Sequence, residues 1–87
     1  MYYLIATFDK KGEVFSVPSA VPKPALAVRD FGEICKDEKH PFNKFPGDYS
    51  LWIVGEYDEV EGTVKQTNRK LLAEAANFVI KKEDVKK

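Results

Sequence analysis

Alternating side chains over residues 2 to 8 predict the first β-strand of the chain. Tyr2, Leu4, Ala6 and Phe8 would lie on one face and Tyr3, Ile5 and Thr7 on the other, so both faces carry apolar groups. Residues 9 to 12 supply turn chemistry and residues 13 to 17 resume an extended pattern, which predicts a hairpin. Prolines at 18, 22 and 24 keep the next connection extended.

Helical spacing begins at Pro24, a residue that suits the first turn of a helix. The apolar side would hold Ala27, Val28, Phe31, Ile34 and Cys35, and the polar side Arg29, Asp30, Glu33 and Lys36. Gly32 inside this helix costs about 0.8 to 1 kcal/mol relative to alanine. We therefore expect an element, most simply a strand, to pack closely against it. A polar loop is expected over residues 36 to 47.

Residues 48 to 57 form the clearest strand, with a turn at 58 to 62 and an antiparallel return over 63 to 66. Trp52 lies opposite Tyr49 and Leu51, which makes it part of a second buried face or an exposed platform for stacking or dimerisation. Asn68 is a good N-cap for a closing helix. The apolar stripe of that helix would be Leu71, Leu72, Ala75, Ala76, Phe78 and Val79.

The element order is therefore β-β-α-β-β-α. We expect one α+β domain over residues 1 to 80, with an antiparallel sheet of about four strands and two helices, followed by a basic tail over 81 to 87. At roughly 0.05 to 0.15 kcal/mol per residue, folding would be favourable by about 4 to 13 kcal/mol. No apolar run is long enough to span a membrane, the start lacks a basic leader, and a single cysteine suits a reducing cytoplasm.

Charge is unevenly distributed although 14 basic and 14 acidic residues cancel. Residues 1 to 47 carry 7 Lys/Arg against 6 Asp/Glu, residues 48 to 64 carry none against 5, and residues 65 to 87 carry 7 against 3. The three segments sum to +1, −5 and +4. A neutral chain of this kind can present one acidic and one basic surface, and only the basic one attracts phosphate.

One segment carries a family resemblance. Residues 43 to 58, NKFPGDYSLWIVGEYD, resemble the K-H-P-x-D-Y-x-L-x-x-x-G-E-F/Y-D signature of the small nonstructural protein of gokushovirus-type microviruses, which are single-stranded-DNA phages. Phe8-Asp9, Val14 to Pro18 and Ala27 to Phe31 match further positions of that family in order, and the similarity covers roughly residues 3 to 79. Phe45 stands where the family usually has histidine. The resemblance implies a DNA-binding protein in a bacterial host, active when the phage makes or packages single strands.

Chemistry suggests three places for a DNA contact, because a single strand needs cations for phosphates and aromatic faces for bases. The 36 to 45 loop offers Lys36, Lys39, His40 and Lys44 with Phe42 and Phe45, unless both rings simply cover the core. The expected last helix offers Asn68, Arg69 and Lys70 at its N-terminus, with Lys65 nearby. The alternative is that these cations form ion pairs with Glu59 or Glu61 of the adjacent turn and bind no phosphate. Weaker candidates are Lys10 and Lys11 in the first turn, with Tyr3 expected to be exposed beside them, and Arg29 on the polar side of the first helix.

Catalysis is not expected. Cys35 lies on an apolar helix face, where an inert core thiol is the simpler interpretation. Asp48 and Asp58 bracket a strand about 30 Å long, so they cannot share one metal ion. We predict no catalytic residue, no metal and no cofactor.

Two functions remain as hypotheses. The first is non-sequence-specific binding of single-stranded DNA by a homodimer or higher homo-oligomer during phage genome replication or packaging. The alternative is a protein-interaction module, a scaffold or replication regulator, that uses the acidic turn at residues 56 to 61.

Overall fold

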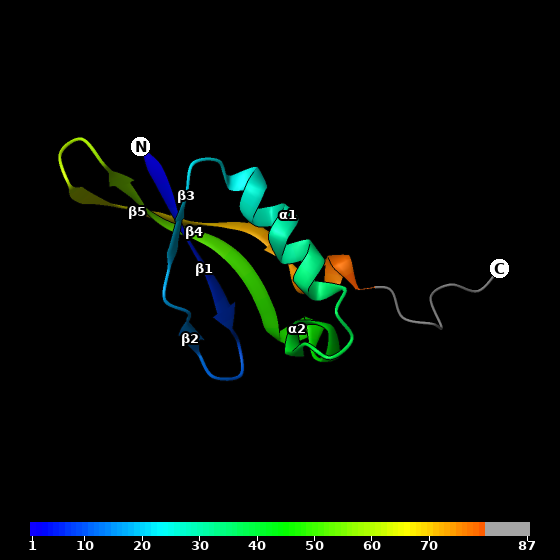
Figure 1. Cartoon of the computed structure of the whole chain (residues 1–87). Coiled ribbons are helices and arrows are strands. Elements are labelled where there is room, and N and C mark those ends of the chain that lie inside the picture. Colours follow the sequence, from blue (N-terminus) through cyan, green and yellow to red (C-terminus); the bar gives the residue numbers. More distant parts are fainter. Residues whose placement is uncertain (80–87) are drawn as a thin grey trace.

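The computed structural model describes residues 1 to 79 as a five-stranded antiparallel sheet with one long helix across one of its faces (Figure 1). The strands are β1 (Tyr2–Asp9), β2 (Val14–Phe15), β3 (Ser19–Val21), β4 (Tyr49–Asp58) and β5 (Thr63–Glu74). The helices are α1 (Pro24–Cys35), the short α2 (Pro41–Lys44), and the 3-10 turns η1 (Pro46–Asp48) and η2 (Ala75–Phe78). The predicted 81 to 87 tail lies outside the described residues.

Sheet order is β2-β1-β4-β5, with β3 also pairing with β1. All pairs are antiparallel, and β1 pairs along its length with β4, from Tyr2 opposite Tyr57 to Asp9 opposite Tyr49. The α+β class and the antiparallel sheet are therefore confirmed. The strand count is five rather than four, because residues 19 to 21 return to pair with Tyr3, Leu4 and Ile5 despite the prolines around them.

The closing helix predicted from Asn68 is wrong. Residues 68 to 74 continue β5, where Leu71 pairs with Trp52 and Ala73 with Leu51, and only the single turn η2 follows. The ten-residue strand β4 needs a hydrogen-bonding partner on its outer edge, and a four-residue return would have left most of that edge unpaired. Two register shifts in the β4–β5 pair change which face successive residues occupy. The apolar residues of this strand therefore recur at intervals that resemble those of a helix.

The core lies between α1 and the sheet. Its buried members are Ile5, Phe31, Cys35, Leu51, Ala73 and Ala75. Cys35 is fully buried, which raises the pKa of its thiol and makes it the inert core residue expected. Gly32 has the close neighbour that its place in a helix predicted. The neighbour is the Phe78 ring of η2 rather than a strand, and a Cβ at Gly32 would lie 3.0 Å from it.

Candidate nucleic-acid interface

α1 lies across one face of the sheet (Figure 1). We call the opposite face the open face, although Ala6 and Ser50 on it are buried and Trp52 and Val54 are half-buried. Because side chains alternate along a strand and Ile5 and Leu51 point into the core, their neighbours Ala6 and Trp52, which pair with each other, point to the open face. Trp52 therefore lies on the side of the sheet away from the core under α1, where it is half-buried.

Three aromatic rings gather on the open face from three different strands. Phe8 of β1 and Phe15 of β2 have ring centroids 4.6 Å apart, and Phe15 meets Trp52 edge-on at 6.3 Å. The Trp52 indole Nε1 donates a 2.8 Å hydrogen bond to the Oγ of Ser50, which is buried. That bond fixes the orientation of the indole, so the ring is held in place before any ligand arrives.

Arg69 of β5 joins this group, which we call the aromatic cluster (Phe8, Phe15, Trp52). Its guanidinium carbon lies 5.3 Å from the centroid of the Phe15 ring and 5.9 Å from that of Trp52. Both distances are within the range of a cation–π contact. The cation is exposed and its donors are not committed to a carboxylate within 4.0 Å among residues 1 to 79. A planar cation thus stands beside planar apolar surfaces.

The same face carries a groove that crosses the strands, which we call the cross-sheet groove. Its volume is about 510 Å³. It is lined by Ala6, Phe15, Ser16, Pro18, Val54, Gln66, Thr67, Asn68 and Arg69. Residues from β2, β1, β4 and β5 all contribute, so the groove runs across the sheet rather than along one strand.

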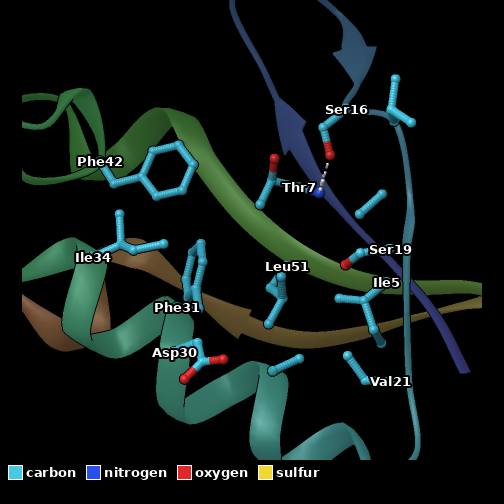
Figure 2. Close-up of a pocket in the computed structure, with 13 residues that line it drawn as sticks. Ile5, Thr7, Ser16, Ser19, Val21, Asp30, Phe31, Ile34, Phe42 and Leu51 are labelled. Atoms are coloured by element: carbon cyan, nitrogen blue, oxygen red, sulfur yellow. Dashed lines mark hydrogen bonds between the residues drawn. The ribbon is translucent and has the colours of Figure 1, made fainter.

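A second depression lies on the helix side, between α1 and the β1–β3 edge, with a volume of about 180 Å³. Figure 2 shows Phe31 and Phe42 toward one end of it and Ile5 and Val21 toward the other. Asp30 is the only charged side chain that lines it. An apolar pocket with one carboxylate does not suit a polyanion.

The eleven predicted DNA-contact residues lie in four separate places, which are β5, the β1–β2 turn, α1 and the 36 to 45 segment. Lys65, Arg69 and Lys70 lie on β5, an edge strand with no carboxylate before Glu74. They lie in a strand and not at a helix N-terminus, so the predicted phosphate site at free helical amides does not exist. The expected pairing with Glu59 or Glu61 is also absent from residues 1 to 79, where Glu59 instead lies 2.8 Å from the N-terminal ammonium.

The other candidates lie elsewhere. Lys10 and Lys11 are in the β1–β2 turn, where Lys10 contacts Glu74 at 3.7 Å. Arg29 is exposed on α1, and Lys36 lies 3.8 Å from Glu33. Lys39 and Lys44 are exposed around α2. The structure therefore does not join all predicted cations into one track.

The two phenylalanines of the 36 to 45 segment differ. The Phe42 ring packs against Tyr49 at 4.6 Å and Phe31 at 5.4 Å, so it covers the core as the simpler interpretation proposed. Phe45 is 58% exposed. Sequence reasoning did not select Phe8, Phe15 or Ser16. The alternation of β1 and the hairpin register were the signals that would have placed these residues beside Trp52.

Within residues 1 to 79, no helix is long and apolar enough to cross a membrane and no three His, Cys, Asp or Glu side chains form a metal-binding group. A family model described as "Phage ORF5 protein" matches residues 2–78. No curated protein and no solved structure matches the chain.

Proposed function

The chain belongs to the Phage ORF5 protein family, and we propose that it binds single-stranded DNA on the open face of its sheet. The observation that carries this proposal is the aromatic cluster with the Arg69 guanidinium over two of its rings. Stacking surfaces beside cations are what sequence-tolerant single-strand binding requires. The finer assignment, to the nonstructural protein of gokushovirus-type microviruses acting in genome replication or packaging in the bacterial cytoplasm, is part of the proposal and rests on the resemblance in residues 43 to 58.

Bases and phosphates would take different parts of this surface. Bases would stack on Phe15 and Trp52, which are half-buried, beside or in place of the Arg69 guanidinium that lies over their rings. Phosphates would contact Arg69, which is exposed and has no carboxylate within 4.0 Å among the described residues. Lys65 and Lys70 are also exposed on this edge strand, but they pair with Glu56 and Ile53 and so point to the α1 side of the sheet. Arg69 can serve both, because a guanidinium stacks on a ring and binds phosphate through its edge.

The charges on β5 also argue against one mode of self-association. An exposed edge strand invites a second copy to pair with it. Antiparallel pairing of β5 with itself about Thr67 would place Lys65 opposite Arg69, and a shift by one residue would place Lys65 opposite Lys70. Like charges directly opposite each other destabilise a strand pair. The edge is therefore better suited to a polyanion, and the homo-oligomer we propose would use another surface.

Two arginines on opposite sides of the molecule test the site. We expect Arg69→Gln to weaken binding of an oligo-dT of about 12 nucleotides by about fivefold to tenfold. This range assumes that one lost charge-assisted contact costs about 1 to 1.4 kcal/mol of binding free energy. The plot of log affinity against log salt should become shallower by about 0.7. Arg29→Gln removes the same charge from exposed α1 and should change neither value. Fluorescence anisotropy at about 50 and 200 mM salt measures both.

An equal effect of the two substitutions would show that net charge, not the open face, governs binding. No saturable signal for the wild type at low salt would contradict the DNA proposal. The alternative, a protein-interaction module, would then rest on the acidic β4–β5 turn with Asp58, Glu59 and Glu61, at the end of the sheet away from α2 (Figure 1).

A further inference from the structure

β5 departs from regular pairing beside the cross-sheet groove. Ile53 pairs with Lys70 and Gly55 with Gln66, so the three residues Thr67, Asn68 and Arg69 lie opposite Val54 alone. Such a bulge takes its residues out of the regular ladder and changes the directions of their side chains, and bulges are common next to binding sites. Here the bulged residues all line the groove.

The groove combines an apolar floor with polar walls. Ala6 and Val54 come from the two central strands, and Phe15 adds a ring. Gln66, Thr67 and Asn68 stand on the β5 side and Ser16 on the other. A nucleobase has the same two-part chemistry, since its flat faces are apolar and its edge carries hydrogen-bond donors and acceptors.

Several of these polar groups have unused hydrogen-bonding capacity. The Thr67 Oγ1 is buried and has no partner among residues 1 to 79, an arrangement that is costly and that calls for an explanation. The Ser16 Oγ accepts from the Thr7 amide at 3.0 Å, which leaves its proton free to donate. The amides of Gln66 and Asn68 are exposed, and each offers donors and an acceptor.

We infer that the cross-sheet groove holds one unpaired nucleobase of the bound strand and distinguishes base types by hydrogen bonds from Gln66 and Asn68. Thr67 lines the groove, so a change of its rotamer would bring the unpartnered hydroxyl to the same base. Arg69, which also lines the groove, places a cation near the phosphate of that nucleotide. This inference rests on the proposed function and adds to it, because stacking and phosphate contacts alone give little discrimination between bases.

Oligo-dT and oligo-dC of equal length are the probes, because the two pyrimidines differ in the donors and acceptors of their edges far more than in ring size. We expect the two dissociation constants of the wild type to differ by at least about fivefold. In the double variant Gln66→Ala, Asn68→Ala the ratio should fall to within about twofold. Asn77→Ala, which removes an exposed amide from η2, is the matched control and should keep the wild-type ratio. Arg69→Gln should weaken both probes equally.

Thr67→Val replaces the hydroxyl by a methyl group of similar shape. Because the hydroxyl has no partner within residues 1 to 79, the melting temperature should stay the same or rise, while the dT-to-dC ratio shrinks. Wild-type affinities equal within about twofold, or a ratio that survives in the double variant, would overturn the inference and leave DNA binding intact. Failure to bind either probe would overturn the proposed function as well.

Discussion

Phe15→Ala is expected to weaken binding of oligo-dT by about tenfold, whereas Phe45→Ala should change it by less than about twofold. Phe15 is half-buried in the aromatic cluster and lines the cross-sheet groove. A base stacked on such a ring contributes about 1 to 3 kcal/mol, and 1.4 kcal/mol is tenfold in affinity. Phe45 is more exposed, at 58%, but lies between α2 and η1, away from the open face. Anisotropy titration of both variants measures the difference.

Phe15→Leu separates stacking from folding in this comparison. Leucine keeps most of the apolar contact with Phe8 and the Arg69 side chain but has no aromatic face, so stability should be largely retained while affinity is lost. Circular dichroism and melting curves verify that all three variants are folded. A larger loss of affinity in Phe45→Ala than in Phe15→Ala would contradict this assignment and place the DNA contact in the 36 to 45 segment.

Phe31→Ala should have the largest effect on folding, lowering the free energy of unfolding by about 3 to 5 kcal/mol. Phe31 is 2% exposed and packs between the sheet, the Phe42 ring at 5.4 Å and the Phe78 ring at 6.0 Å. Removing it leaves a cavity where α1, α2 and η2 meet. For a chain with a total stability of about 4 to 13 kcal/mol, that loss is about a quarter of the total or more.

Urea denaturation followed by the fluorescence of Trp52, the only tryptophan, measures this change. Phe45→Ala is again the matched control and should lie within about 0.5 kcal/mol of the wild type, since its ring is mostly in solvent. A loss below about 1.5 kcal/mol in Phe31→Ala would show that the three elements are held by other contacts.

The first strand, the helix and the central strand could be predicted from the sequence because their apolar spacing is regular, although β4 carries one extra residue, Val54, opposite the step from Leu4 to Ile5. Residues 2 to 8 and 48 to 57 alternate, and residues 24 to 35 repeat at helical spacing after a proline. β5 could not be predicted in full, because its two register shifts break the alternation that identifies a strand. Pairing with β4, a tertiary contact, outweighed the local helical spacing after Asn68.

The candidate site was harder to predict than the fold. Sequence reasoning selected cations and aromatic residues that are neighbours in the chain, and so emphasised the 36 to 45 segment. The aromatic cluster instead combines Phe8, Phe15 and Trp52, which only the register of three strands brings together. Arg69 was selected for a helix terminus, and its contact with two rings depends on β5 being a strand.

The most direct test of DNA binding on the open face is a titration of the isotopically labelled protein with oligo-dT, followed by the amide signals in nuclear magnetic resonance spectra. We expect the largest chemical-shift changes in the amide signals of residues 14 to 16, 52 to 54 and 66 to 71 and in the indole N–H signal of Trp52. The amide signals of α1 should not shift. Shifts confined to α1 and residues 36 to 45, or no shifts at all at low salt, would contradict the assignment of DNA binding to this surface.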